Sequence, residues 1–305
     1  MRRALALLAL GLGLAGCGLG AGEELPGGVE LRITRDFGER LVGSTRRDGV
    51  REGDTVLRLL RSSRREVETR YGGRFVQSIG GLSGRGPDGR RDWFFFVNGL
   101  ESELGAAEYG LNDGDRVQWD YRDWRATMTV PAIVGAFPEP LLHGTKGKRF
   151  PVRMECEDEG GAPCREVKRR LADAGVKTSS SAFGADATQN VLRVIVARWP
   201  KARTVQAVGR LAGKPDESGV FARFEGDRLQ LVGEGGETVR EAAPGTGLVA
   251  ALAPGPKEIL WVVTASDQPG LQRAAQSLSE GSLRDAFALA ATPEGPRKLP
   301  LRGGR

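Results

Sequence analysis

The chain has 305 residues, of which 39% are hydrophobic and 28% charged, so it is long enough for two globular domains. Its formal net charge of +6 comes mostly from arginine, and no RNA-reading aromatic motif accompanies the surplus. These values argue against a nucleic-acid partner.

Residues 1–17 have the pattern of a secretory signal peptide. Two arginines precede an apolar run from Ala4 to Ala15, which is too short to span a bilayer comfortably. The run ends in Leu-Ala-Gly-Cys17, which resembles the lipobox of bacterial lipoproteins. The resemblance implies that the peptide is cut before Cys17 and that its thiol carries the acyl chains. The alternative is an ordinary secretory signal with a chance cysteine.

The lipobox resemblance implies a location and an anchor. The mature protein would lie on the extracytoplasmic face of the cell membrane, held by its N-terminal lipid. Residues 18–28 are rich in glycine and are predicted to be a flexible tether. No later stretch is long and apolar enough to span a membrane.

Residues 29–125 are predicted to form one domain of strands around one helix. VELRITRDF alternates apolar and polar residues, as a strand does. The segment that begins with GDTVLRLL predicts a helix with Asp54 as its N-cap and the glycine pair 72–73 at its end. With three later strands, the order strand, strand, helix, strand, strand, strand favours a β-grasp-like mixed sheet.

The stretch WFFFVNG, residues 93–99, predicts a strand that is apolar on both faces. Trp93 and Phe95 point one way, and Phe94 and Phe96 point the other. Such a strand is usually buried on both sides. We expect Phe94 and Phe96 to pack under the helix of residues 56–60.

Amphipathic rings are concentrated in this unit. All three tyrosines and three of the five tryptophans lie between residues 71 and 124. Tyr and Trp are enriched where a surface is partly wet, so some of these rings predict a stacking platform for a flat ligand or a partner protein. The candidate contact residues are Trp93, Tyr109, Trp119, Tyr121 and Trp124.

The same stretch resembles the transcobalamin C-terminal-like domain family. The motifs that carry the resemblance are the aromatic strand, Val97-Asn98-Gly99, Gly105-Ala106, Tyr109, Asp113-Gly114-Asp115 and Trp119-Asp120-Tyr121. It covers about residues 29–124 and implies a β-grasp-like fold. In the cobalamin carriers of this family, an α-domain clasps the other side of the corrin. This chain has no all-α domain, so its second unit or a membrane transporter would have to supply the other wall for a corrinoid.

The rest of the chain predicts a second domain. Residues 126–149 hold several prolines and predict a linker, although residues 130–137 could also pack as an edge strand. Residues 150–298 alternate helical and strand patterns, which predicts an α/β domain and hence an α+β fold for the whole chain. Residues 299–305 are predicted to be a disordered tail.

Ionisable side chains give no catalytic constellation. Cys156 and Cys164 predict a disulfide in an oxidising compartment, and as a zinc site they would lack two ligands. His143, the only histidine, has no carboxylate or cysteine partner evident in its proline-rich segment. Six arginines between residues 58 and 74 fit either a solvated face or a contact with anionic headgroups or another anionic ligand. We expect no catalytic residue and no metal site.

The sequence therefore favours a non-catalytic binding protein at the membrane surface. Its ligand would be a corrinoid or another flat small molecule taken up by the cell, or a partner such as a transporter or an envelope protein. One alternative is a scaffold for envelope proteins without a small ligand, which predicts an exposed aromatic patch and no pocket. The other is an enzyme with its site in residues 150–298, which would need a cleft with clustered ionisable groups.

Overall fold

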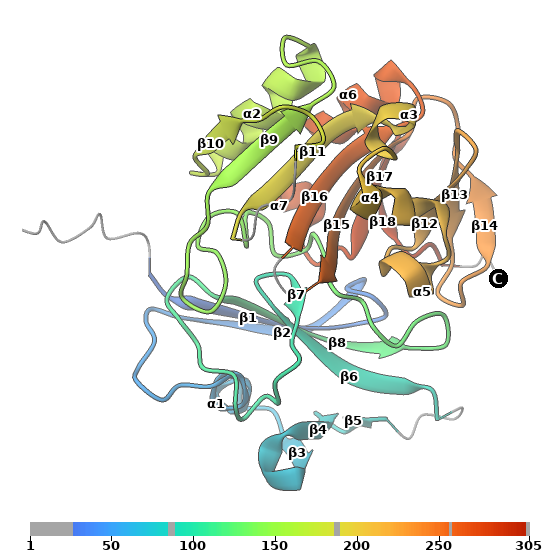
Figure 1. Ribbon diagram of the computed structural model, residues 1–305. Helices are drawn as coiled ribbons and strands as arrows, with labels where there is room; N and C mark the ends of the chain where they lie inside the picture. Colours follow the sequence, from blue (N-terminus) through green and yellow to red (C-terminus); the bar gives the residue numbers. More distant parts are fainter. Residues whose placement is uncertain (1–26, 85–88, 186–189, 256–257, 303–305) are drawn as a thin grey trace, which may run out of the picture.

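The chain folds into two stacked units, each built on its own sheet (Figure 1). The computed structural model describes residues 27–84, 89–185, 190–255 and 258–302. The predicted signal peptide with Cys17, and all of the predicted tether except Gly27 and Gly28, lie outside the described residues. In the part that is described, no helix is both long and apolar enough to cross a bilayer. The fold is α+β, as predicted.

The first unit is a five-stranded mixed sheet. β1 and β8 pair in parallel at its centre, and the other neighbours pair antiparallel. A short helix and a small three-stranded sheet cover the face turned away from the second unit (Figure 1). The strand order is β2 (Arg40–Arg47), β1 (Val29–Arg35), β8 (Arg116–Asp123), β6 (Arg91–Val97) and β7 (Leu100–Glu101). The covering elements are α1 (Val56–Ser62), β3 (Val67–Arg70), β4 (Phe75–Ile79) and β5 (Leu82–Ser83).

The helix α1 is shorter than predicted. Its N-cap is Thr55 rather than Asp54, and it ends at Ser62 instead of at the glycine pair 72–73. The residues that follow it enter β3, in which Val67 and Thr69 are β-branched and therefore favour a strand. The glycine pair instead belongs to the short 3-10 turn Tyr71–Gly73 that joins β3 to β4.

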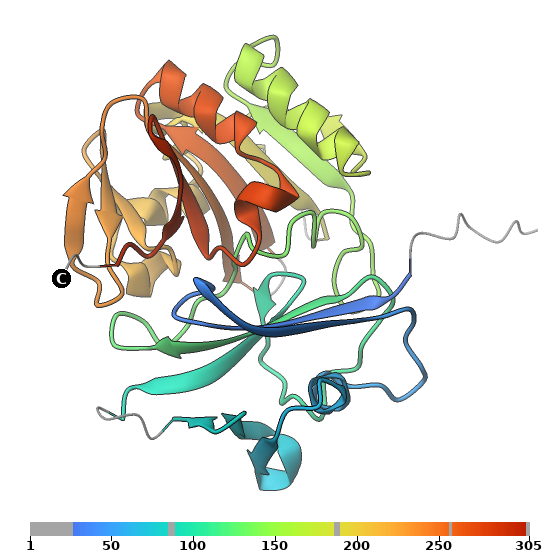
Figure 2. The same ribbon diagram turned by 180° about the vertical axis from the view of Figure 1, so that it is seen from behind.

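The second unit is a seven-stranded sheet with apolar clusters on both faces. α2 and α6 pack against each other over one face, where Figure 2 shows them side by side. Short helices and a three-stranded sheet cover the other face. The order is β10 (Thr178–Ser180), β9 (Val152–Cys156), β11 (Leu192–Arg198), β16 (Glu258–Ala265), β15 (Gly247–Gly255), β17 (Ala288–Thr292) and β18 (Gly295–Leu299). The covering elements are α2 (Ala162–Asp173), α6 (Gln268–Gln276), α3 (Trp199–Ala202), α4 (Gln206–Gly209), Arg210–Ala212, α5 (Pro215–Ser218), β12 (Ala222–Glu225), β13 (Arg228–Val232) and β14 (Thr238–Glu241), and α7 (Glu280–Leu283) precedes β17.

The predicted disulfide is confirmed. Cys156 at the end of β9 is bonded to Cys164 in the first turn of α2. It closes the acidic loop between a strand and the helix that covers the same sheet. The bond therefore fixes the start of α2 to the edge region of the second unit.

The segment of residues 126–149 connects the two units, and its central part, residues 130–141, is packed between them. Val130 and Ile133 join the apolar cluster on one face of the seven-stranded sheet, while Val134 and Phe137 join the cluster on the other. It forms no strand, and its regular contact with the first unit is a single bridge between Ala132 and Leu100. Its prolines and apolar residues thus form part of the inter-unit core.

The prediction of a disordered tail is wrong for residues 299–302. Leu299 ends β18 and is buried, because β18 completes the seven-stranded sheet beside β17. Leu301 forms a bridge with Gly233, and Arg302 pairs with Asp36 of the first unit at 3.2 Å. Residues 303–305 lie outside the described residues.

The turn between β1 and β2 inserts Phe37 into the second unit. The Phe37 ring contacts the rings of Phe221 and Phe287, with centroids 4.8 and 5.1 Å away. Asp36 and Phe37 both have a φ of 59°, a region that side-chain-bearing residues rarely occupy. The buried carboxylate of Asp120 on β8 holds this turn by accepting hydrogen bonds from the amides of Phe37 and Gly38, at 3.0 and 2.8 Å.

Burial raises the pKa of Asp120 to about 6, although its hydrogen bonds favour the charged form. Between about pH 4 and pH 6 the folded protein thus holds a proton on Asp120 that the unfolded chain has released, so this group destabilises the fold as the pH rises. Asp120→Asn cannot titrate. We compare the two proteins by the difference in their free energies of unfolding, wild type minus variant. We expect this difference to fall by about 1–3 kcal/mol from pH 4 to pH 7. Urea unfolding at both pH values measures it, and a constant difference would contradict the assignment.

Candidate functional site

The two faces of the aromatic strand β6 meet the opposite partners from those predicted. Trp93 and Phe95 pack with the α1 residues, whereas Phe96 belongs to the cluster that contains the Phe37 and Phe287 rings. Phe94 packs against that same cluster. The expectation that Phe94 and Phe96 lie under α1 is therefore wrong. Alternation along a strand defines two faces, but only the fold decides which partner covers each one.

Four of the five candidate contact residues are core residues of the first unit. The rings of Trp93 and Tyr121 contact each other in a tilted arrangement, with centroids 5.2 Å apart. Their polar atoms donate to the Leu82 and Ser83 carbonyls. The centroid of the Trp119 ring lies 4.9 Å from that of the Phe95 ring. The four candidates Trp93, Tyr109, Trp119 and Tyr121 are 2–6% exposed. They therefore form no solvent-facing platform in this structure. They hold β4 and β5 and α1 against the sheet instead.

Trp124, the fifth candidate, is half-buried just beyond the end of β8. Its amide donates to the Arg90 carbonyl at 3.1 Å, which continues the pairing of β8 with β6. The five candidates are thus gathered in one unit, but burial separates their rings from a common outer surface. The rings most available to solvent are Tyr71 and Phe75, which were not selected as candidates.

A groove of about 600 Å³ lies between the two units. The first unit supplies the end of β6, the loop that follows β7, and Tyr109, while the second unit supplies the ends of β15 and β16. The connecting segment adds Thr129, Pro131, Thr145 and Lys146. The full lining is Val97, Leu100, Glu101, Ser102, Glu103, Leu104, Tyr109, Thr129, Pro131, Thr145, Lys146, Ala253, Pro254, Gly255 and Ile259.

The groove combines apolar walls with a few polar groups, which is the usual character of a small-molecule site. Of the five sequence candidates, Tyr109 is a lining residue, and burial raises the pKa of its phenol. The groove could not be predicted from the sequence, because its two walls come from segments about 150 residues apart. No periodicity or motif marks Ala253 to Ile259 as facing Leu100 to Leu104.

Glu101 lines the groove, and its carboxylate also contacts two groups of the protein. One of its carboxylate oxygens accepts a hydrogen bond from the Val130 amide at 2.6 Å, and the other lies 3.7 Å from the Arg122 guanidinium. Arg122 is fully buried, lies 3.8 Å from the Phe94 ring centroid, and donates to the Thr127 and Met128 carbonyls. Burial raises the pKa of Glu101 against the opposing effect of Arg122. This carboxylate is therefore a fixed polar group that can orient a ligand.

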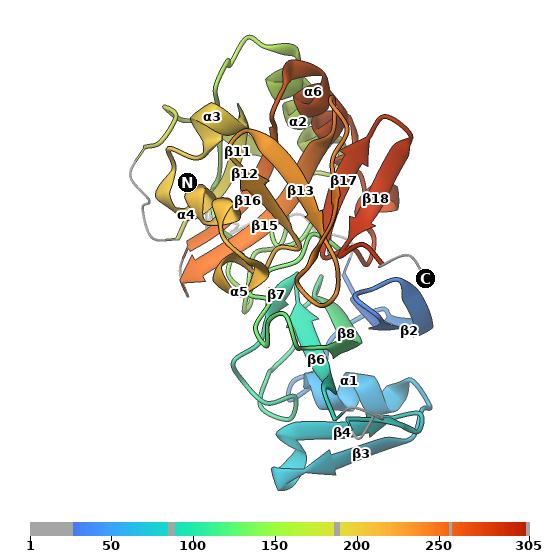
Figure 3. The same cartoon turned by 90° about the vertical axis from the view of Figure 1, so that its right-hand side faces the viewer.

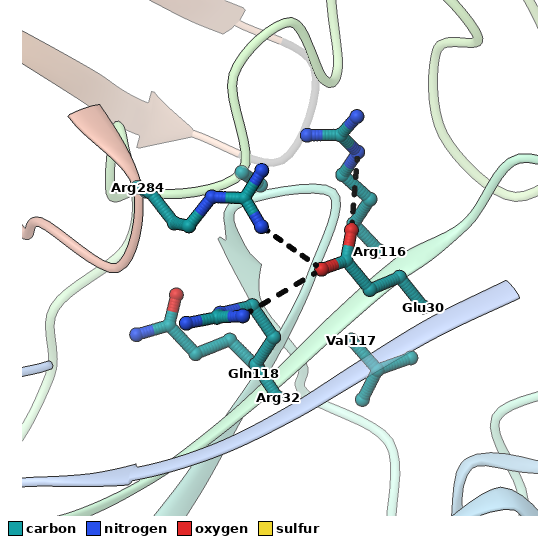
Figure 4. Close-up of a pocket in the computed structure, with 8 residues that line it drawn as sticks. Glu30, Arg32, Arg116, Val117, Gln118 and Arg284 are labelled. Carbon is teal, nitrogen blue, oxygen red and sulfur yellow. Dashed lines mark ion pairs between the residues drawn. The ribbon is translucent and has the colours of Figure 1, made fainter. Parts of the chain in front are cut away.

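A second cavity, at the seam between β1, β8 and α7, is filled by ion pairs. Figure 4 shows the Glu30 carboxylate surrounded by Arg32, Arg116 and Arg284, with nitrogen–oxygen distances of 3.6–3.9 Å. Its volume is about 10 Å³, which is room for about one water molecule. Arg32 also pairs with Asp285, so ion pairs across this seam join the two units.

A shallower recess of about 400 Å³ adjoins this seam. Ser44, Thr45 and Arg46 of β2 form one wall, and Glu280 of α7 lies opposite. Arg116 and Arg284 both pair with Glu280, at 3.0 and 2.6 Å. Because these arginines already have carboxylate partners, the recess is a weaker candidate for a ligand site than the groove.

His143 has a carboxylate partner, contrary to the sequence analysis. Its Nδ1 lies 2.5 Å from the Glu139 Oε1, and its amide donates to the same carboxylate, because a turn brings the two residues together. Nearby, Asn98 donates to Asp115 and to the Gly144 carbonyl. Within the residues that the structure describes, no three histidine, cysteine or acidic side chains are grouped to hold a metal. This network ties the connecting segment to the turns of the first unit.

The comparisons with known proteins concern the first unit. Residues 53–123 match a family model described as a domain of unknown function, DUF4430. This stretch runs from just before α1 to the end of β8 and leaves out β1 and β2. No curated protein matches the chain.

Among solved structures, one similar chain comes from Ruminococcus gnavus ATCC 29149 and is described as a candidate metal binding protein. It is 12% identical, with a TM-score of 0.26, and the alignment covers 32% of this chain and 96% of that one.

The burial of Trp93 predicts a structural cost when it is truncated. We expect Trp93→Ala to lower the free energy of unfolding by about 3–5 kcal/mol, and Trp93→Phe, which loses the bond to Leu82, by about 1 kcal/mol or somewhat more. Met128→Ala, at a side chain that is 60% exposed, should change it by less than about 0.5 kcal/mol. Urea unfolding tests all three. A Trp93→Ala cost as small as that of Met128→Ala would contradict the core assignment.

Proposed function

We propose that this chain is a lipid-anchored extracytoplasmic protein that binds a small molecule in the groove between its two units without transforming it. The observation that carries the proposal is the groove itself. Its volume of about 600 Å³ falls in the range of small-ligand sites. Both units and the connecting segment line it, so a ligand there would contact all three parts of the chain.

The lining fits a partly apolar ligand with polar edges. Leu100, Leu104, Pro254 and Ile259 offer apolar contact, while Glu101 is a fixed acceptor among them. Lys146 and Glu103 are exposed and can reach charged groups on the ligand rim. A flat ring system with polar substituents, such as a corrinoid, matches this combination.

The two-walled construction supports a corrinoid in particular. The resemblance to the transcobalamin C-terminal-like family implies that a β-grasp-like domain covers one side of the corrin and that a second domain covers the other. In this chain the ends of β15 and β16 line the groove together with residues of the first unit, which supports a second wall of this kind. We therefore assign the second unit the role that an α-domain has in the cobalamin carriers.

The chemistry of the groove favours binding over catalysis. Its described lining residues include no histidine or cysteine, and Glu101 is engaged with Arg122 and the Val130 amide. A hydrolytic or transfer site needs a nucleophile bonded to a base, whereas the Ser102 hydroxyl beside Glu101 donates to the Leu104 carbonyl. The envelope-scaffold alternative receives less support, because it predicts an exposed aromatic patch without a pocket, whereas four of the candidate rings are buried and a groove is present.

The groove assignment predicts that a bulky residue at Thr129 blocks the ligand. A chain that starts at residue 18 keeps every described residue and is equilibrated by dialysis against cobalamin and cobinamide, with the bound fraction read from corrin absorbance. Thr129 lines the groove and is exposed, so Thr129→Trp should weaken binding at least about tenfold without disturbing the core. Met128→Trp is the matched control, since Met128 is exposed but is not a lining residue.

Two outcomes would count against this assignment. Equal affinity of the Thr129→Trp and Met128→Trp chains would place the site outside the groove. The absence of saturable binding by the unmutated chain up to roughly 1 mM, which corresponds to about 4 kcal/mol, would overturn the corrinoid as ligand.

The anchor assignment is tested separately. When the full chain is expressed in a bacterial host with radiolabelled palmitate, the label should appear on the protein, and the protein should partition into detergent. Cys17→Ser should lose both properties, because the acylated thiol is gone. Replacing Cys156 and Cys164 together should keep the label, since their thiols form the disulfide. Palmitate on the Cys17→Ser chain would refute the lipobox assignment.

A further inference from the structure

The hairpin of β3 and β4 lies at the end of the molecule opposite the second unit (Figures 1 and 3). Two aromatic side chains at this hairpin are exposed. Tyr71, in the turn, is 79% exposed, and Phe75, the first residue of β4, is 38% exposed. Phe75 lies opposite Arg70 in the register of the hairpin. Neither ring belongs to the apolar core of the first unit.

The backbone of this turn is unfavourable for the residue that occupies it. Tyr71 has a φ of 52° and is followed by Gly72 and Gly73, with φ values of 68° and 89°. Such a conformation suits glycine and costs a residue like tyrosine on the order of 1 kcal/mol or more. Because the Tyr71 ring is exposed, no packing inside the protein compensates for this cost. The Tyr71 ring is therefore free to contact a surface outside the chain.

Positive charge surrounds the two rings. Residues 58–74 contain six arginines and two glutamates, and no lysine. Arg70 and Arg74 flank the turn and are exposed, as is Arg61 on the outer side of α1. Arg70 donates to Gln77 and Arg74 pairs with Glu108, but both guanidinium groups remain at the surface. The end of the hairpin thus joins an amphipathic ring, that of Tyr71, and an apolar ring, that of Phe75, to a net positive surface.

We propose that Arg70, Tyr71, Arg74 and Phe75, which we term the aromatic–arginine tip, dock on an anionic lipid bilayer. Aromatic rings insert at the headgroup level of a membrane, and guanidinium groups bind lipid phosphates with two hydrogen bonds. The two rings bury too little area for stable attachment alone. They add a weaker, lipid-selective contact to the anchor that the N-terminal acyl chains provide.

The tip also gives the anchored protein an orientation. The second unit lies on the opposite side of the five-stranded sheet from the tip, and the groove lies between the two units (Figure 1). With the tip on the bilayer, the groove is held above the membrane plane and the second unit points away from it. The inference rests on the membrane location in the proposed function, but not on the identity of the ligand.

The test measures vesicle binding by the chain that starts at residue 18, which has no acyl chain. It should co-sediment with phosphatidylcholine vesicles that contain phosphatidylglycerol, and less so as salt is added. Tyr71→Asn with Phe75→Thr should weaken binding about tenfold, and Arg70→Gln with Arg74→Gln about fivefold for each charge removed. Asn tolerates the left-handed backbone and Thr favours a strand, so the first pair of changes keeps the fold.

Two controls match these changes at distant exposed positions. Met128→Asn removes an exposed apolar side chain, and Arg228→Gln removes an exposed arginine of β13. Both should bind vesicles as the unmutated chain does. The proposal would be overturned by an equal loss in the controls or by equal binding to pure phosphatidylcholine. It would also be overturned if the tip changes left binding unaffected, and the tip would then be assigned to a protein partner. The corrinoid dialysis contains no lipid, so either assay can fail without the other.

Discussion

The buried carboxylate of Asp120 is the contact on which the arrangement of the two units depends. It accepts hydrogen bonds from the Thr34 hydroxyl and from the amides of Phe37 and Gly38, and so stabilises a turn whose backbone is unfavourable by itself. That turn carries the Phe37 ring into the second unit. A local polar contact within one sheet thus fixes an apolar contact between two sheets.

The groove owes its rigidity to the same inter-unit core. Phe94 and Phe96 on β6 face the second unit, and Arg122 is buried between the Phe94 ring and the connecting segment. Arg122 in turn lies beside Glu101, the acceptor at the groove. The packing that joins the units therefore also positions the polar group of the candidate site.

Local patterns in the sequence predicted the elements better than their partners. The alternation in β6 and the turn at Asn98-Gly99 were sufficient to place a strand and its end. Which side of β6 meets α1 could not be predicted, because both faces are equally apolar. α1 was predicted too long, because its apolar spacing continues into residues that a β-hairpin uses. Leu301 was assigned to a disordered tail, since nothing local indicates that Gly233 pairs with it.

The candidate site was the least predictable feature. The aromatic residues drew attention as contact groups, yet large rings are also the commonest filling of a small core, and four of them serve that purpose. The groove residues Leu104 and Pro254 have no distinctive local pattern. Their proximity depends on the stacking of the units, which is a property of the whole chain.

The close approach at Gly38 shows how closely the backbones of the two units fit together. A Cβ atom at this position would stand 1.7 Å from the Asp285 carbonyl oxygen, so the surfaces of the two units are fitted to each other at the level of the backbone. The first unit cut out at residue 125 would also expose Phe37, Phe94 and Phe96 to water. The two units therefore depend on each other's surfaces, and the first unit alone would lose part of its packing.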